Sequence, residues 1–328
     1  MKKKLLVLLS ALLILTTFFT SCFLFEDNED GQTDDDDELE DNGGGTDTSV
    51  PSVPSKAPEM NADGLKFTFY GTHYSVTGYE APKGATNVDL IIPATYKDLP
   101  VLTVGHRAFL PSAIDKNDVI RSIIVSPGIV TVESAAFSDC TRLTSVTLPD
   151  TVTSIGMGAF ARCTSLPSVT IPASVTTLGT SVFEGCTSLS TINVAPENPN
   201  FCSVDGDLYS KDMKTLIRYA IGKTADSTSY TPKDTVTTLA AGALQASSFT
   251  KVILPAQVIR IEPTVFKDCA KLTEIEVAVT GSWWQTDVPS ATSGTGINAN
   301  NIMKKPAELA KYMTDWSLYM RKYVCRTV

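Results

Sequence analysis

The sequence contains a unit that recurs every 23 residues, and this repeat restricts the possible folds more than any other feature. Three consecutive units begin at Ala136, Ala159 and Val182, and each reads small-Phe-x-x-Cys-x-x-Leu-x-x-apolar-x-apolar. The shared positions are Phe137, Phe160 and Phe183, then Cys140, Cys163 and Cys186, then Leu143, Leu166 and Leu189. A fixed period of roughly 20–50 residues is typical of solenoids, in which each unit is one supersecondary structure.

Less regular units extend the repeat in both directions. Upstream, Phe109 lies 28 residues before the first regular Phe position; downstream, Leu244 and Phe266 occupy that position and are 22 residues apart. Apolar residues recur at matching offsets from Val101 and again from Val236. We therefore expect about six coils of 22–28 residues, stacked so that each coil contacts only its neighbours.

The apolar residues of each unit alternate as they do in a short strand. Val146 and Leu148 share one face because side chains repeat with a period of two, and Pro149 ends the strand because it has no N–H to donate. Val152 and Ile155 form a second inward-facing edge, and the Phe enters from a short helical or 3₁₀ turn. Stacking the coils buries these residues in a continuous core, at about 1.5–3 kcal/mol per large apolar side chain.

The units resemble those of the BspA-like leucine-rich repeat family, which read Ala-Phe-x-x-Cys-x-x-Leu-x-x-Val-x-Ile-Pro-x-x-Val-x-x-Ile-Gly. The resemblance is continuous from Ala136 to Val194 and covers about residues 65–280. It implies an α/β-type but β-dominated, right-handed leucine-rich-repeat solenoid with one short parallel strand per coil. It also implies a binding protein rather than an enzyme, because members of the family are associated with attachment to host matrix and plasma proteins.

The amino terminus has the order of a secretory signal peptide. Lys2, Lys3 and Lys4 precede the apolar run from Leu5 to Thr20, and Ser21 and Cys22 follow. Residues 19–22 resemble a bacterial lipobox, in which the Cys becomes the lipidated first residue of the mature protein. The resemblance implies a lipoprotein signal peptide over residues 1–21, a membrane anchor at Cys22, and a location at the bacterial outer membrane or cell surface. A conventional signal peptide with a nearby Cys is the alternative.

The negative charge of the chain is concentrated in one segment. The sequence has 36 Asp or Glu against 27 Lys or Arg, and residues 26–41 contain eleven of the acidic residues and no basic residue. Residues 22–59 are therefore expected to form a disordered, extended stalk. Without that acidic run and the three lysines near the amino terminus, 25 acidic and 24 basic residues remain. A nearly neutral body excludes the clustered basic surface that nucleic-acid binding requires.

The residue types that usually perform catalysis are scarce. His73 and His106 are the two histidines of the chain, and the sequence contains no HExxH, GxSxG, Walker A or GxGxxG motif. No CxxC pair with zinc spacing is present either. We therefore expect no enzymatic activity, no cofactor and no metal. The recurring cysteines are expected to be buried thiols, because parallel neighbours keep Cβ atoms about 4.8 Å apart, longer than a disulfide allows.

The repeat is interrupted once and needs closure at both ends. Two apolar runs flank residues 211–214, which predicts a β-hairpin insertion near 195–229 within the solenoid domain of residues 60–280. Residues 65–69 and 74–76 are expected to form a hairpin cap at the amino-terminal end. Residues 281–328 are expected to form a loop and cap, with a helical apolar stripe from Leu309 to Tyr323. Trp283 and Trp284 either cover the last coil or bind a sugar or a protein.

The outward positions of the predicted strands form the candidate binding surface. Together with Trp283 and Trp284, these are Ser145, Thr147, Ser168, Thr170, Thr191, Asn193, Lys251, Glu274 and Glu276. Solenoids commonly bind partners with such an extended surface. The expected function is adhesion to a protein ligand, such as a host matrix or plasma protein. Capture of a glycan or peptide and a scaffold role in the cell envelope are the alternatives.

Overall fold

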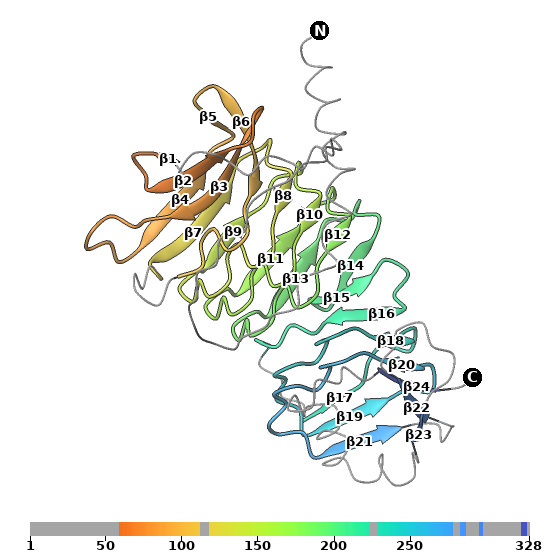
Figure 1. Ribbon diagram of the computed structural model, residues 1–328. Helices are drawn as coiled ribbons and strands as arrows, with labels where there is room; N and C mark the ends of the chain where they lie inside the picture. Colours follow the sequence, from red (N-terminus) through yellow and green to blue (C-terminus); the bar gives the residue numbers. More distant parts are fainter. Residues whose placement is uncertain are drawn as a thin grey trace, which may run out of the picture. The chain divides into compact units, whose positions relative to one another are not determined.

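The structure is a computed structural model that describes residues 59–111, 118–223 and 228–277, together with three carboxy-terminal strands. Within these residues the chain forms a β-solenoid of about eight turns and contains no helix (Figure 1). The segment after each Phe is a series of turns, where a helical or 3₁₀ turn and an α/β-type unit were expected. The reason is a left-handed residue two positions after the Phe in most units, with φ of 62° at Asp139, 57° at Arg162 and 60° at Asp268.

Each coil contributes strands to two parallel ladders. One ladder contains β4 (Val88–Ile92), β7 (Ile120–Val125) and β9 (Ser145–Thr147), followed by the pair β11 (Ser168–Ile171) and β13 (Thr191–Val194). The other contains β6 (Leu99–Val104), β8 (Thr131–Val132), β10 (Ser154–Ile155) and β12 (Thr177–Leu178). The prediction of one strand per coil was therefore wrong. The second inward-facing edge is itself a strand, because equivalent backbone groups of neighbouring coils meet there and pair.

A hairpin extends the second ladder at its amino-terminal end, as expected. β2 (Leu65–Phe69) and β3 (Tyr74–Tyr79) pair antiparallel, and β1 (Glu59–Met60) adds to β2. β3 then runs parallel to β6, which also pairs with β5 (Thr95–Tyr96). Leu65, Phe67 and Val76 are buried, so the hairpin covers apolar residues of the first coil.

A column of stacked phenylalanine rings runs through the first part of the solenoid. The ring centroids of Phe109 and Phe137 are 5.1 Å apart, those of Phe137 and Phe160 5.2 Å, and those of Phe160 and Phe183 5.9 Å. All four side chains are buried. Stacked pairs of this kind contribute about 0.5–1.5 kcal/mol beyond the area they bury. The 23-residue period therefore places each ring directly against the equivalent ring of the next coil.

The interruption of the repeat is an antiparallel meander that separates two hydrophobic cores. It consists of β14 (Phe201–Val204), β15 (Asp207–Ser210) and β16 (Thr215–Arg218), and the expected hairpin is formed by β15 and β16. Leu208 belongs to the first core, whereas Tyr209 and Leu216 belong to the second. The meander is thus buried on both faces. We call residues 88–194 the first stack and residues 215–277 the second stack.

The second stack repeats the two-ladder arrangement. β16 pairs parallel with β18 (Thr238–Leu239), which pairs with β20 (Arg260–Ile261), and the other ladder contains β17 (Ser229–Tyr230), β19 (Lys251–Leu254) and β21 (Glu274–Val277). Among the carboxy-terminal strands, β24 (Tyr323–Arg326) pairs antiparallel with β20 and with β22 (Trp283–Thr286), and β22 pairs with β23 (Thr295–Ile297). Tyr323 therefore begins a strand, where the end of a helical stripe was expected. Residues 309–322 of that stripe lie outside the described residues.

Candidate binding surface

Polar side chains occupy outward positions on β7, β9, β11 and β13, and we call this set the hydroxyl array: Ser122, Ser145, Thr147, Ser168, Thr170, Thr191 and Asn193. In β11, Val169 and Ile171 are buried and Ser168 and Thr170 are exposed, as the period of two requires. The register places Ser145 next to Ser122, Ser168 next to Thr191, and Thr170 next to Asn193. Ser145, Thr147 and Asn193 are exposed and Thr191 is half-buried. These expected surface residues are therefore gathered on one face of the first stack (Figure 1).

A proline interrupts the backbone ladder under this array. The N–H of Thr144 donates to the Arg121 carbonyl at 2.8 Å, and the N–H of Ser190 donates to the Pro167 carbonyl at 2.9 Å. Pro167 occupies the equivalent position before β11 but has no N–H, so it cannot bond back to Thr144. β9 and β11 are consequently in separate sheets although they are neighbours (Figure 1). The 23-residue period still gives Ser145 and Ser168, and Thr147 and Thr170, equivalent positions in neighbouring coils.

The outward residues of the second stack are charged, unlike the hydroxyl side chains of the first stack. The ammonium of Lys251 lies 2.8 Å from a Glu274 carboxylate oxygen and 2.6 Å from one of Glu276, and these hydrogen bonds raise the pKa of Lys251. β13 and β17 are not paired among the described strands, and the N–H of Ile192 donates to the Gly206 carbonyl of the meander instead. The sequence placed all these residues on one surface, but the meander divides it into the hydroxyl array and a separate charged surface.

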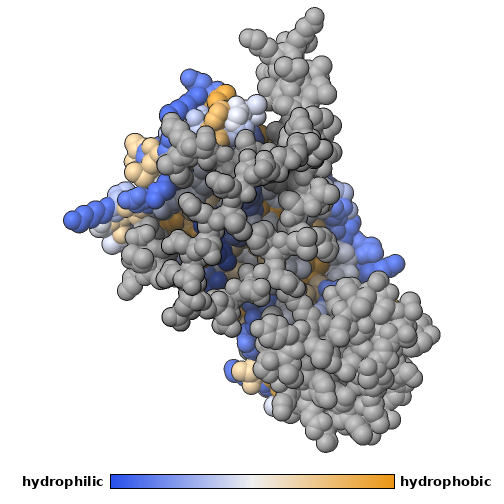
Figure 2. All heavy atoms as spheres, in the orientation of Figure 1, coloured by the Kyte–Doolittle hydropathy of each residue, from blue (hydrophilic) through white to orange (hydrophobic). Residues whose placement is uncertain are grey.

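Two exposed isoleucines lie beside the hydroxyl array and were not expected. Ile91 of β4 is 59% exposed and Ile124 of β7 is 47% exposed. The register pairs Ile91 with Ile124 and Ile124 with Thr147, so the isoleucines begin the same row as the threonine. Both lie in continuous apolar runs, residues 90–92 and 123–125, which hide the alternation of inward and outward positions. In Figure 2 orange and pale-orange atoms appear between blue ones at the amino-terminal end of the solenoid.

A neutralised carboxylate lies next to the isoleucines. Arg121 Nε donates to Asp89 Oδ1 at 2.9 Å, a second guanidinium nitrogen pairs with Oδ2, and Ser122 Oγ donates to Oδ1 at 2.5 Å. The hydrogen bonds from Arg121 and Ser122 lower the pKa of Asp89 to about 2. Asp89 is therefore ionised at neutral pH, but its charge is compensated by a neighbour on the adjacent strand.

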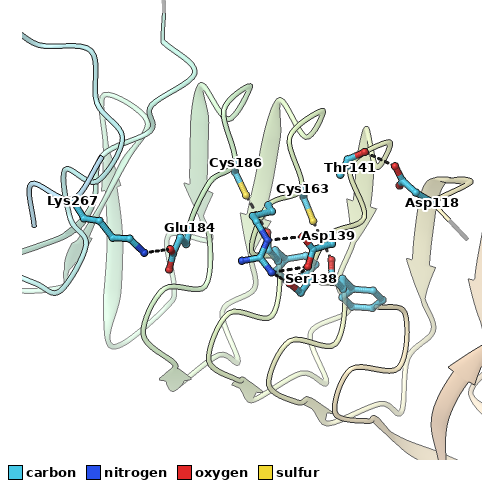
Figure 3. Close-up of polar contacts among 11 residues, drawn as sticks. Asp118, Ser138, Asp139, Thr141, Cys163, Glu184, Cys186 and Lys267 are labelled. Atoms are coloured by element: carbon cyan, nitrogen blue, oxygen red, sulfur yellow. Dashed lines mark hydrogen bonds and ion pairs between the residues drawn. The ribbon is translucent and has the colours of Figure 1, made fainter. Parts of the chain in front are cut away.

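The cysteine column consists of free, buried thiols that connect successive coils. Cys163 Sγ donates to the Phe137 carbonyl at 3.2 Å and Cys186 Sγ donates to the Phe160 carbonyl at 3.0 Å (Figure 3). Burial raises the pKa of both thiols, that of Cys186 to about 11. A thiol with a raised pKa is a poor nucleophile, so this column serves packing. The described residues contain no group of three or more His, Cys, Asp or Glu side chains arranged for a metal ion.

Hydrogen-bonded and ion-paired side chains lie on the turns beside the cysteine column (Figure 3). Arg162 Nη2 donates to Asp139 Oδ2 at 2.6 Å, and the Thr141 hydroxyl donates to Asp118. Glu184 accepts hydrogen bonds from Lys267 at 3.0 Å and from Gln245 Nε2 at 2.9 Å. Lys267 and Gln245 belong to the second stack, whereas Glu184 belongs to the first. Glu184 is thus a polar side-chain link between the two stacks, which are also joined by the hydrogen bond from the N–H of Gly222 to the Leu189 carbonyl at 2.8 Å.

A scan against protein-family models identifies the repeat. The model described as "BspA type Leucine rich repeat region" matches in six copies, over residues 111–207 and 201–293, which is more than half of the 328-residue chain. The chain belongs to the BspA-type leucine-rich repeat family. The six copies agree with the number of coils expected from the sequence; the structure has about two further turns, contributed by the less regular segments.

Solved structures of other bacterial leucine-rich repeat proteins are similar to this family member. The pneumococcal vaccine antigen PcpA is 24% identical, with a TM-score of 0.44, over 70% of this chain and 71% of that chain. A leucine rich cell surface protein from Faecalibacterium prausnitzii is 22% identical, with a TM-score of 0.38, over 68% and 76%. A leucine-rich repeat protein from Eubacterium ventriosum is 20% identical, with a TM-score of 0.36, over 66% and 70%. No curated protein matches the chain.

Several predicted sites of this family member fall outside what the structure describes. Trp283 and Trp284 lie in β22, but only their backbone is described. Cys22, the signal peptide and the acidic stalk lie outside the described residues. In the described part of the chain, no helix has the length and hydropathy of a membrane span.

Proposed function

We propose that this chain is a non-enzymatic, lipid-anchored surface protein that binds a protein ligand through the hydroxyl array. The observation that supports this proposal is that Ser145, Thr147, Ser168, Thr170 and Asn193 are all exposed at outward positions of neighbouring strands in the first stack. Small hydroxyl side chains can donate and accept hydrogen bonds, and their short rotamer-poor stems lose little entropy on binding. A flat surface of this kind suits another protein surface better than a small substrate, which requires a concave pocket.

The chemistry of the array supports binding rather than catalysis. His73 precedes β3 and His106 follows β6, so both histidines belong to the ladder opposite the hydroxyl array. A serine or threonine nucleophile needs an adjacent base, and no hydrogen bond between a histidine and an array hydroxyl is present among the described residues. We therefore assign the hydroxyls to recognition. The ligand class that the family resemblance suggests is a host matrix or plasma protein.

A binding panel with the soluble 60–328 fragment tests the proposal. The fragment is applied to immobilised matrix proteins, plasma proteins and glycans, and we expect a protein ligand to be retained. The double variant Thr147→Arg with Thr170→Arg places two bulky charges in one row and should weaken binding at least tenfold. Thr180→Arg, at an exposed turn outside the array, is the matched control. Retention of glycans alone, or equal binding by both variants, contradicts the proposal.

The anchor is tested separately through Cys22. Two or more acyl chains on one residue give stable membrane attachment, because each buried methylene contributes about 0.8 kcal/mol. In the producing bacterium, Cys22→Ser should move the protein from the membrane fraction to the soluble fraction and abolish incorporation of a labelled fatty acid. Unchanged fractionation and labelling of the variant would show that the chain is not anchored at this residue.

A further inference from the structure

The outer edge of β4 carries backbone groups without partners among the described residues. β4 ends its sheet, with β7 as its neighbour on the other side. The N–H of Val88 donates to the Val119 carbonyl at 2.8 Å and the Ile92 carbonyl accepts from the N–H of Ser126 at 3.1 Å, so alternate residues of β4 face β7. The N–H and C=O groups of Asp89 and Ile91 consequently point to the open edge, because successive residues alternate in direction. No hydrogen bond joins these four groups to any described residue.

Among the described residues this edge has few of the features that usually protect a terminal strand; one of them is a register irregularity in the pairing with β7, between Val88 and Asp89. Proteins block edges with lysine, proline, bulges that twist the strand away, or a covering segment. β4 contains no lysine or proline, and the charge of Asp89 is compensated by Arg121. Ile91 remains 59% exposed. The edge is therefore a template for one further strand.

We propose that β4 accepts an extended segment of a protein partner as an additional strand. The inference rests on the proposed protein-binding function and adds a second contact that uses different residues from the hydroxyl array. The added strand would form up to four backbone hydrogen bonds with Asp89 and Ile91.

The side-chain rows define the chemistry of the segment. Ile91 and Ile124 form an apolar row, whereas Asp89 continues into Ser122 and Ser145. A strand added to β4 places one residue beside Ile91 and another, two positions away, beside Asp89. An apolar residue fits the first position, and Lys, Ser or Thr fits the second, where the carboxylate accepts a hydrogen bond. The partner segment therefore has an apolar residue separated by one position from a basic or hydroxyl residue.

A second copy of this chain fits the edge less well. Symmetric antiparallel pairing centred on Leu90 would place Asp89 opposite Ile91 twice, a charged residue against an apolar one. Pairing centred on Asp89 would oppose two carboxylates, and pairing centred on Ile91 would oppose Asp89 to Pro93, which has no N–H. The row chemistry thus favours a different chain.

A proline scan with synthetic peptides tests the inference. The probes are an array of ten-residue peptides that carry Val or Ile two positions from Lys, Ser or Thr, and the same peptides with Pro at the intervening position. We expect binding of the first set by fluorescence anisotropy, at least tenfold weaker binding of the second set, and slower hydrogen exchange at the Ile91 amide in the complex. Ile91→Pro in the 60–328 fragment removes an N–H that has no acceptor among the described residues, so it should keep the thermal midpoint and weaken binding at least tenfold. Ile91→Lys is the second variant in case the proline perturbs β4.

Controls separate this inference from the proposed function. Thr147→Arg with Thr170→Arg should weaken binding in the protein panel at least tenfold but leave peptide binding by β4 within about twofold. Absence of peptide binding at millimolar concentration, or equal binding by the wild type, Ile91→Pro and Ile91→Lys, overturns the inference while leaving the array untouched. A dimer in sedimentation equilibrium that dissociates in Ile91→Pro also overturns it, because the edge would then belong to a second copy.

Discussion

The two stacks share one backbone plan but fill it with different side chains. In the first stack the Phe position of successive coils holds stacked rings. In the second stack it holds Leu244 in one coil and Phe266 in the next. The second stack instead has an aromatic cluster elsewhere, with the rings of Tyr219, Tyr230 and Phe249 at centroid distances of 5.0–5.1 Å. The comparison shows that a solenoid coil tolerates loss of one packing column when another apolar group fills the same core.

The cysteine column is interrupted between the two stacks. Cys269 in the second stack donates to the Leu244 carbonyl at 3.1 Å, just as the first-stack thiols donate to carbonyls of the preceding coil. The buried Arg218 lies close enough to both parts of the column for its positive charge to lower the pKa of Cys186 and of Cys269, although burial raises both pKa values overall. Arg218 Nη1 donates to the Gly242 carbonyl at 2.6 Å, while the buried Nη2 has no hydrogen-bond partner among the described residues. Burial therefore lowers the pKa of Arg218, because removal from water disfavours the charged guanidinium.

The largest effect should come from breaking the aromatic column of the first stack. Phe160→Ala removes a fully buried ring that stacks on two others and should destabilise the protein by about 3–5 kcal/mol. Urea denaturation of the 60–328 fragment measures the loss, with Thr170→Ala as the surface control, expected within about 0.5 kcal/mol. Hydrogen exchange should show that first-stack amides lose protection most. Equal loss in both stacks would mean that they unfold as one unit.

A smaller effect is expected from separating the stacks at Glu184. Glu184→Ala removes the contacts to Lys267 and Gln245 and should cost about 1–2 kcal/mol, with protection lost mainly in the second stack. Burial alone would raise the pKa of Glu184, but the hydrogen bonds from Gln245 and Lys267 outweigh it and the pKa is lowered. This contribution is therefore present above the ordinary glutamate pKa of 4.5 and is lost as the pH falls through the lower folded value. An acid titration in which Glu184→Ala and the wild type lose stability in parallel would contradict the assignment.

The smallest effect should come from the thiol column. Cys163→Ser keeps a donor to the Phe137 carbonyl but replaces a well-packed sulfur, at a cost of about 1 kcal/mol. Because burial raises the pKa of Cys163, its contribution is complete below the ordinary thiol pKa of 9.0 and falls as the pH rises above it. In the native protein, alkylation followed by mass spectrometry should modify half-buried Cys202 at least tenfold faster than Cys163. Equal rates would show that the first stack opens as readily as the meander.

Much of the fold was predictable because the repeat leaves few alternatives. Phe137, Phe160 and Phe183 recur at one spacing, and only stacked coils bury all of them together. The hydroxyl positions Ser168 and Thr170 followed from strand alternation alone. Ile91 and Ile124 were missed because each is the middle residue of three consecutive apolar residues. The sequence pattern therefore does not indicate that the middle residue faces solvent.

The sequence by itself determined the length of each coil and the residues that fill its core, because residues one period apart occupy equivalent places in a stack. It also determined which strand positions face outward wherever polar and apolar residues alternate. Only the tertiary structure decided that the meander divides the core in two, that Glu184 contacts the second stack, and that β4 has a strand neighbour on one side alone among the described strands. These features depend on which distant backbone and side-chain groups become partners. That pairing forms only when the coils pack, and the local sequence pattern does not predict it.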